Sequence, residues 1–429
     1  MHIFFSGIGG VGIGPAALIA KQAGYQVSGS DIRDGQTIQE LKQKGVTDIY
    51  IGQTADQIAE VHQKNPIDWF VHSSAITQDQ AELEFCRQNN IKTSKRDEFI
   101  NEILSQKQLK LIAVAGTHGK TTTTAMIIWL FKKLDLPVSY SVGAKVGDYE
   151  MSAFDSNSQY FVYECDEFDR NFLAFKPFIA VISGIGYDHH EIYPTRENYY
   201  QAFRQFLNQS DGRIIWSADA EKLNMLSNSK TRVEQENKHD FNQINLAGLY
   251  NRRDAWLAVN TLLSVCDVPQ QQLIEIINTF PGASRRFEEI VPNLYSDDAH
   301  TPEKIRGCMS VAQETAKAGQ KIVVLYEPLT NRRMHHLGNE HFDVFEGASK
   351  IYWLPSYLAR EDPNQKVLTP GELIQNLSPK LQKITQSAAR DERLKYVIAN
   401  HLQNGDMVVA MAGGGADSLD DWLRDNFST

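Results

Sequence analysis

Short apolar runs, each followed by glycine or polar residues, recur along this chain and set its predicted architecture. Runs this short are typical of buried strands in a parallel sheet. Between several of them stand stretches with helical spacing, such as 16–20, 126–131 and 247–265. Strands that alternate with helices predict an α/β chain built on parallel sheets. The predicted strands lie at 2–6, 26–30, 69–72, 109–113, 160–163, 178–182, 294–296, 321–326, 350–354 and 407–411.

The pattern breaks twice, which predicts three domains. A charged stretch at 94–98 precedes the strand at 109–113, and a Pro-Gly segment at 281–287 precedes the strand at 294–296. We therefore expect domains at 1–107, 108–291 and 292–429. The length of 429 residues fits this division, because a domain usually holds about 100–200 residues.

The strand at 109–113 runs into a glycine turn that is typical of phosphate binding. The turn reads G-x-x-G-K-T, two residues shorter than the common G-x-x-x-x-G-K-[ST]. Its backbone N–H groups and the start of the next helix favour a phosphate chain. Lys120 would neutralise the β- and γ-phosphates, and the Thr121 hydroxyl would bind Mg²⁺. A glycine turn without a ligand is the alternative. The predicted ATP-binding residues here are Gly116, Thr117, His118, Gly119, Lys120, Thr121 and Thr122.

Another glycine turn, G-x-G-x-x-G, follows the first strand and opens a helix. About 20 residues later the strand at 26–30 ends at Asp31, the position at which a Rossmann-type domain holds a ribose. We therefore predict a nucleotide site in a Rossmann-like first domain. The alternative is that the glycines only allow close packing of the helix. The predicted residues are Gly7, Gly9, Gly10, Val11, Gly12, Asp31, Ser73 and Ser74.

Two strands of the central segment end in groups that can bind metal. Four carboxylates stand within 164–169, after the strand at 160–163, and they repel one another unless a cation is near. The strand at 178–182 leads to Asp188-His189. Ligands bind at the carboxyl ends of parallel strands, so we predict that Thr121 and Glu164 bind Mg²⁺ and that His189 is a further metal ligand. A solvated acidic loop and a structural histidine are the alternatives.

Scattered polar residues predict further contacts in the central and third segments. Asn251 at a helix start could bind an adenine edge or act as the helix N-cap. Arg286 could reach a phosphate or form a surface ion pair. Asp298 and His300 follow the strand at 294–296, and Arg333 could bind a carboxylate or be solvated. We assign Asp298 with Asn251 and Arg286 to ATP, and His300 with Arg333 to a substrate carboxylate.

Composition excludes several classes of protein. The net charge of −10 argues against a nucleic-acid surface. No apolar stretch is long enough for a membrane span, and the first residues lack the features of a signal peptide. The four cysteines are scattered without a C-x-x-C pair, as expected for reduced residues of a cytoplasmic protein.

These motifs, in this order and over essentially the whole chain, resemble the Mur ligase family, which adds amino acids to the peptidoglycan precursor. The resemblance implies a Rossmann-like first domain for the UDP-substrate, a P-loop ATPase-like central domain, and a Rossmann-like third domain for the amino acid. It also implies an ATP- and Mg²⁺-dependent ligation through an acyl phosphate, with Lys120, Glu164 and His189 in catalytic roles. The motifs that carry it are 7–12, 71–76, 115–124, 164–169, 188–189 and 285–287.

Within the family, the sequence is most similar to the branch that joins L-alanine to UDP-N-acetylmuramate. Several other branches carry a carbamylated lysine after the histidine motif, but no lysine lies between Lys176 and Lys222. The chain departs from the alanine-adding pattern at Gly184, Gly186 and Asp254, and at 297–302 and 329–330. A monomer or a homodimer is expected.

Two other functions stay open at this point. One is a cell-wall recycling ligase that joins a preformed peptide to UDP-N-acetylmuramate. The other, from a different class, is a nicotinamide-dependent oxidoreductase or nucleotide-sensing regulator built on the first glycine turn.

Overall fold

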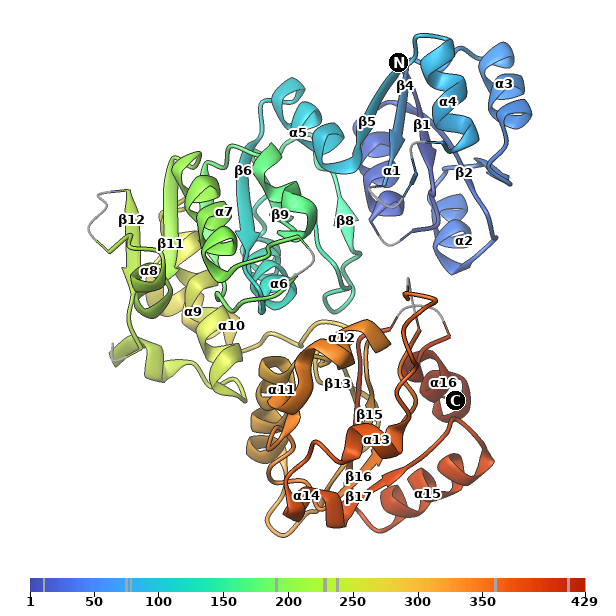
Figure 1. Cartoon of the computed structure of the whole chain (residues 1–429). Coiled ribbons are helices and arrows are strands. Elements are labelled where there is room, and N and C mark those ends of the chain that lie inside the picture. The colour runs from blue at the N-terminus through green and yellow to red at the C-terminus, as the bar shows by residue number, and fades with distance from the viewer. Residues whose placement is uncertain are drawn as a thin grey trace. The chain divides into compact units, whose positions relative to one another are not determined.

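The chain folds into three separate sheets, each flanked by helices (Figure 1). The structure is a computed structural model, and it describes all residues except 11, 74–75, 78, 190–191, 227–229, 237–238, 359–360, 415–416 and 429. Contacts divide the chain into two compact units, Met1–Ile244 with Asp254–Phe280 and Asn245–Arg253 with Pro281–Thr429. The first two sheets belong to the first unit, and the third sheet belongs to the second.

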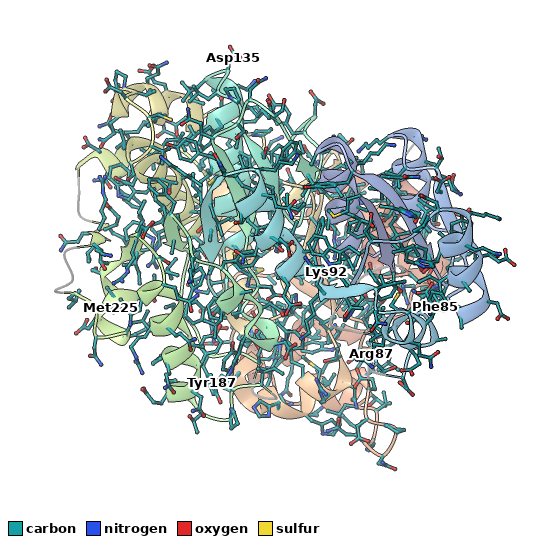
Figure 2. All side chains as sticks on the ribbon, turned by 90° about the horizontal axis from the view of Figure 1, so that it is seen from above. Phe85, Arg87, Lys92, Asp135, Tyr187 and Met225 are labelled. Carbon is teal, nitrogen blue, oxygen red and sulfur yellow. The ribbon has the colours of Figure 1, made fainter. Side chains whose placement is uncertain are left out.

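The first sheet is parallel, in the order β3-β2-β1-β4-β5. Apolar side chains of α1, α2 and α5 pack on one face of it, and those of α3 and α4 pack on the other. Lys92, labelled in Figure 2, lies over the ring of buried Trp69, and its Nζ is 3.7 Å from the ring centroid. The elements are β1 His2–Ser6, α1 Ile13–Gln22, β2 Gln26–Asp31, α2 Gln36–Gln43, β3 Asp48–Ile51, α3 Ala55–Lys64, β4 Trp69–His72, α4 Ala81–Gln88, β5 Lys92–Lys95 and α5 Arg96–Gln106.

The second sheet has the order β12-β11-β10-β6-β9-β7-β8 and is parallel except for β8. One apolar core runs from the first sheet into this one without a break, which is why both belong to one unit. The elements are β6 Lys110–Ala115, α6 Lys120–Lys133, β7 Ser139–Ser141, β8 Ser152–Ala153, β9 Tyr160–Glu164, η1 Phe168–Ala174, β10 Ile179–Ile182, α7 Arg196–Asn208, β11 Gly212–Trp216, α8 Ser217–Lys222, β12 Thr231–Glu234, η2 His239–Gln243, α9 Leu249–Leu263 and α10 Gln270–Ile277.

The third sheet has the order β13-β14-β18-β15-β16-β17, with only β13 antiparallel to its neighbour. Helices α11 to α14 cover one face, and α15 and α16 cover the other. The elements are β13 Glu288–Val291, β14 Leu294–Asp297, α11 Pro302–Thr315, β15 Ile322–Glu327, α12 Asn331–Leu337, η3 Gly338–His341, β16 Lys350–Trp353, α13 Pro370–Ile374, α14 Pro379–Ile384, β17 Thr385–Ser387, α15 Glu392–Gln403, β18 Met407–Ala412 and α16 Leu419–Phe427.

The predicted α/β class and three-part architecture are confirmed, and every predicted strand is present within two residues of its expected bounds. The boundary near 107 falls between α5 and β6. Strand β13 pairs with the third sheet although it lies before the boundary near 291, and the domain limits stay predictions. None of the described helices is long and apolar enough to cross a membrane.

Candidate active site

Three neighbouring strands of the second sheet bring the central motifs together. Strand β6 leads to the phosphate loop at 116–119, β9 ends at the acidic motif, and β10 leads to the histidine motif. Both β9 and β10 pair with β6 in parallel, so the three segments leave the sheet at the same edge. The acidic and histidine motifs therefore lie on the same side of the sheet as the phosphate loop, as expected from the sequence.

The phosphate loop has the backbone that its glycines allow. Gly116 and Gly119 take φ angles of +149° and +77°, and a Cβ at Gly116 would lie 2.4 Å from Ser183 Oγ. Gly119 is the N-cap of α6, which begins at Lys120 as predicted. Thr117 N donates to Gly184 O at 2.8 Å and ties the loop to the segment after β10. The turn therefore presents a helix N-terminus and a lysine at one point.

Lys120 is held at the loop by a buried carboxylate. Its Nζ donates to Gly116 O at 2.6 Å and to Glu167 Oε2 at 2.8 Å, and the Glu167 side chain is 1% exposed. Burial lowers the pKa of Lys120, but Glu167 and Asp166 outweigh burial and raise the pKa above its ordinary value. Burial in turn raises the pKa of Glu167, whereas Lys120 and His189 lower it to about 2. The pair is therefore ionised and keeps the lysine positive.

Thr121 and Glu164 meet directly, as a shared Mg²⁺ site requires. Thr121 Oγ1 donates to Glu164 Oε1 at 2.8 Å, and Gly143 N donates to Glu164 Oε2 at 2.7 Å. A hydroxyl and a carboxylate beside a phosphate site are the oxygen ligands that Mg²⁺ prefers. The donor set therefore fits the ion that the sequence predicts.

His189 joins a second group of ligand atoms. A carboxylate oxygen of Asp166, one of Glu167 and a ring nitrogen of His189 lie within 4.8 Å of one another. His189 Nε2 is 3.5 Å from Glu167 Oε1, and its pKa, which burial lowers, is raised overall by Glu167 and Asp188. Burial raises the pKa of Asp166, with the charge of Glu167 as the next cause. Two carboxylates with one histidine are a chemically reasonable cation site.

A network of hydroxyls links the phosphate loop to helix α7. Thr117 Oγ1 donates to Gly186 O at 3.1 Å, accepts from Gly186 N at 2.9 Å, and lies 2.7 Å from the hydroxyl of Tyr199. Tyr193 donates to Glu167 O at 2.6 Å, and Tyr187, labelled in Figure 2, donates to Tyr193 O at 2.7 Å. These hydrogen bonds hold the segment 184–189 against the phosphate loop. Gly184 and Gly186 have no side chains to contribute, so the backbone and the neighbouring hydroxyls make the bonds.

Left-handed backbone occurs at three non-glycine residues of the same sheet edge. Asp169, Arg170 and His189 have φ angles of +52°, +57° and +56°. Left-handed backbone at such residues costs about 1–3 kcal/mol each, and it is common at functional sites. Lys95 Nζ contacts Asp169 Oδ2 at 3.0 Å and links the acidic segment to strand β5 of the first sheet.

The first glycine turn is closed on itself by Asp31. Gly7 has a φ of +77°, and Gly9 N donates to Asp31 Oδ2 at 2.8 Å. Gly10 N donates to Gly7 O at 2.9 Å, and Gly12 is the N-cap of α1. The Asp31 carboxylate thus shapes the loop, a role that the sequence did not indicate. Of the other predicted residues, Ser73 accepts from the neighbouring His72 ring, and Val11 and Ser74 lie outside the described residues.

The two glycine turns border one cavity of about 310 Å³. The first turn contributes Gly12, and the phosphate loop contributes Lys120. The acidic motif adds Glu164 and Asp166, and α5 adds Arg96. The predicted nucleotide loop and the predicted phosphate loop of this unit therefore face one space.

The remaining predicted residues lie in the second unit, and four of them come together. Arg286 Nη1 binds Asp298 Oδ2 at 3.0 Å, and His300 Nδ1 is 2.7 Å from Asp298 O. Burial, together with the charges of Lys304 and Arg333, lowers the pKa of His300 to about 3. Burial raises the pKa of Asp298, but Arg286 and Lys304 outweigh it and hold the pKa well below its usual value.

Asn251 does not fill the N-cap position that was open for it. Helix α9 begins at Leu249, and Asn251 Nδ2 donates to Ala247 O at 2.8 Å, whereas a capping side chain accepts a bond. Its predicted contact with adenine stays a prediction, as do the roles of the other predicted site residues.

Sequence reasoning missed Glu167, Tyr199 and Arg96. Glu167 stands in the recognised acidic motif, but nothing in the order of residues separates it from Glu164. Tyr199 on α7 and Arg96 at the start of α5 reach the site only through the packing of distant segments. The one available signal for Arg96 was its place in the charged stretch 94–98, which leads into a helix.

Family models match the two segments of the chain that hold the first and second sheets. Residues 2–108 match the model of the Mur ligase family, catalytic domain, and residues 114–273 match the Mur ligase middle domain. A UDP-N-acetylmuramate–L-alanine ligase from Clostridium perfringens is 29% identical, covering 96% of this chain and 95% of that protein.

Two solved structures share the fold over nearly the whole chain. The UDP-N-acetylmuramate–alanine ligase MurC from Thermotoga maritima superposes with a TM-score of 0.74 at 22% identity, covering 97% of this chain and 96% of that one. A murein peptide ligase from Psychrobacter arcticus gives 0.64 at 22% identity, with the same coverage.

Proposed function

Because this chain belongs to the Mur ligase family, we propose that it is an ATP-dependent ligase that joins L-alanine to UDP-N-acetylmuramate. The observation that carries the proposal is similarity along the full length, at 29% identity, to a relative with that name. The neighbouring strand ends with Lys120, Glu164 and His189 support the same reaction class, since it needs a nucleotide triphosphate and a cation.

The two glycine turns divide the substrates between them in this proposal. The phosphate loop takes ATP, because Lys120 supplies a positive charge at a helix N-terminus. The first turn takes the UDP part of the carrier, because it lacks a lysine and borders the same cavity. This arrangement would bring the carrier carboxylate toward the γ-phosphate.

The reaction proceeds in two steps. A carboxylate oxygen of UDP-N-acetylmuramate attacks the γ-phosphorus, the bond from that phosphorus to the β,γ-bridging oxygen breaks, and ADP leaves. The amine of L-alanine then attacks the acyl carbon of the acyl phosphate. Phosphate leaves with the electron pair of the carbon–oxygen bond, and the amine loses a proton. Because acyl phosphates hydrolyse, water has to be excluded from the site.

The chain contributes positioning and charge. Lys120, kept protonated by Glu167, balances the transferring phosphoryl group. Thr121 and Glu164 would hold one Mg²⁺, and His189 with Asp166 and Glu167 would hold a second. When bound, Mg²⁺ neutralises developing charge on the phosphate oxygens. Tyr199 orients Thr117 and with it the phosphate loop.

The second unit would supply the amino-acid site. We assign Arg286, Asp298 and Asn251 to ATP, and His300 and Arg333 to the amino acid. His300 is neutral at physiological pH, so its ring can accept a hydrogen bond from the incoming ammonium group. Arg333 would pair with the carboxylate of the amino acid.

The decisive experiment is a panel of amino acids with UDP-N-acetylmuramate and Mg²⁺-ATP, followed by phosphate release and by the mass of the product. Release that requires both UDP-N-acetylmuramate and L-alanine supports the proposal. Release that is equal with all amino acids, or that needs no carrier, contradicts it.

Two observations make the recycling ligase the second candidate. The murein peptide ligase fold matches over 97% of this chain, and the segment 297–302 departs from the alanine-adding pattern. Including a tripeptide in the panel separates the two, because only the recycling enzyme would prefer it to L-alanine. The oxidoreductase alternative has no support from the comparisons.

A further inference from the structure

One cation of the shared cavity has no part in the function described so far. The cavity is lined by Arg96 and Lys120 as cations and by Glu164 and Asp166 as anions. Lys120 and Glu164 serve the nucleotide and metal in the proposed function. Arg96 lies instead on the side of the first glycine turn, where Gly12 lines the same space.

The Arg96 guanidinium is fixed along one edge only. Its Nη2 lies 3.1 and 3.0 Å from the two carboxylate oxygens of Asp97, and its Nε is 3.3 Å from Oδ1. The hydroxyl of buried Tyr163 donates to the same Oδ1 at 2.5 Å. Nη1 has no hydrogen-bond partner among the residues that the structure describes, and the side chain is 26% exposed. The free edge therefore faces the cavity.

That free edge lies against the first glycine turn. A Cβ added to Gly12 would be 2.4 Å from Arg96 Nη1, so only glycine leaves room for the guanidinium in this position. Gly12 is also the N-cap of α1, and Arg96 is the first residue of α5. A cation is unfavourable at the positive start of a helix. The start of α1 and a guanidinium at one point favour an incoming anion.

We propose that Arg96 is a substrate-binding residue that donates through Nη1 to an oxyanion of the carrier substrate. Asp97 and Tyr163 are positioning residues that aim the guanidinium at Gly12. The inference rests on the proposed function, because the carrier is taken to be UDP-N-acetylmuramate. That molecule offers two oxyanions, its diphosphate and its carboxylate, and a guanidinium suits either.

The test is calorimetric binding of UDP-N-acetylmuramate to the full chain and to Arg96→Met. Loss of a charge-assisted hydrogen bond should weaken binding by about 10- to 100-fold, while ATP binding stays within about two-fold. UDP-N-acetylglucosamine, which carries the diphosphate but no carboxylate, identifies the oxyanion. An equal loss with both ligands points to the diphosphate, and a loss confined to UDP-N-acetylmuramate points to the carboxylate.

Arg306→Met is the matched control, because Arg306 pairs with Asp343 at 3.3 Å in the other unit. It should leave the binding of both UDP ligands unchanged. Arg96→Lys keeps the charge, but a lysine cannot hold Asp97 and reach Gly12 together. It should bind several-fold more weakly than the parent, and it decides the matter if Arg96→Met does not fold.

Gly12→Ala gives an independent measurement. If its new Cβ acts by displacing Arg96, it weakens the binding of UDP-N-acetylmuramate in the parent and adds little in the Arg96→Met background. Equal binding by the parent, Arg96→Met and Arg96→Lys would overturn the inference and leave the proposed function standing. A parent that does not bind UDP-N-acetylmuramate would overturn both.

Discussion

The two glycine turns of the first unit stand at the same place in the strand-to-helix connection and differ in the charges around them. Each follows a parallel strand and ends in a glycine that caps a helix, but the φ of +77° is at Gly7, the first glycine of one turn, and at Gly119, the helix cap of the other. In the first turn the carboxylate of Asp31 takes the N–H of Gly9. In the second, Lys120 opens the helix and is bound by Glu167.

The comparison teaches that the turn offers an anion site, while the neighbouring side chains decide which anion enters. A lysine among carboxylates suits a triphosphate that arrives with Mg²⁺. A turn closed by its own aspartate, with an arginine nearby, suits a ligand that needs less positive charge. The following predictions test this difference, beginning with the largest expected effect.

Lys120→Ala should lower turnover by roughly 10²–10³-fold, because the transferring phosphoryl group loses its main positive partner. Phosphate release with UDP-N-acetylmuramate and L-alanine is the measurement, with circular dichroism to verify folding. Lys110→Ala is the control, since Lys110 begins β6, the strand that leads to the phosphate loop, but lies over the Phe178 ring, 4.9 Å from its centroid. Turnover of Lys120→Ala within a few-fold of the parent would contradict the role of the lysine.

Asp31→Ala should weaken binding of UDP-N-acetylmuramate by about 10-fold or more, because Gly9 N loses its acceptor and the first turn loosens. ATP binding should not change. Asp31→Asn keeps an acceptor and should have a smaller effect. Calorimetry with NAD is the counter-test. Tight NAD binding without UDP-N-acetylmuramate binding would mean that the first turn serves a dinucleotide.

Glu164→Gln should raise the Mg²⁺ concentration needed for half-maximal rate by about 10-fold, because it removes a unit charge at nearly constant shape. Glu150→Gln, which alters a carboxylate paired with Lys44 at 3.0 Å, is the control. His189→Ala should reduce turnover more than ATP affinity. Unchanged Mg²⁺ dependence in Glu164→Gln would mean that Glu164 does not bind the ion. Mass spectrometry of the active parent should find no carbamylated lysine.

Tyr199→Phe should weaken ATP binding by several-fold, because Thr117 loses one hydrogen bond worth about 1 kcal/mol. Tyr187→Phe, on the same network but bound to Tyr193 O, should leave ATP affinity closer to that of the parent. If Tyr187→Phe weakened ATP binding more than Tyr199→Phe, the phosphate loop would be supported mainly by another part of the hydroxyl network.

The comparison of charges extends to the end of strand β14, where the side chain of His300 is neutral. The pKa of His300 falls from its ordinary value near 6.5 to about 3 in the folded chain. Between these values the unfolded chain binds more protons, so the free energy of unfolding falls as pH is lowered. From pH 7 to pH 6 the loss is about 0.7 kcal/mol. Denaturant titration should show a smaller loss for His300→Gln. Identical pH dependence in both chains would show that His300 does not make this contribution.

Much of the fold was accessible from the sequence because its strands are apolar and short. The strands β6, β9 and β10 and the start of α6 were predicted together with their shared edge. Strands such as β3 and β5 were not, because residues like 48–51 and 92–95 are polar or half-exposed and carry no apolar signal. Pairing with a central strand, rather than local pattern, makes them strands.

The candidate site was predictable at the level of motifs and not of partners. Glycine spacing and the order of motifs indicate which segments meet. The choice of Glu167 over Glu164 as the partner of Lys120 depends on a few ångströms of loop geometry. Arg96 and Tyr199 come from other elements, and only the packing of α5 and α7 brings them near.

The left-handed backbone at Asp169, Arg170 and His189 has a consequence for protein engineering. Glycine at such positions relieves about 1–2 kcal/mol of steric cost, partly offset by its greater freedom in the unfolded chain. A selection for thermal tolerance alone would therefore favour glycines in these two segments. Loosening them also loosens the residues around Lys120, so such gains would trade against catalytic rate. Positions at which a glycine raises thermal stability and lowers the catalytic rate would then identify the catalytic edge of the second sheet, even before a ligand is known.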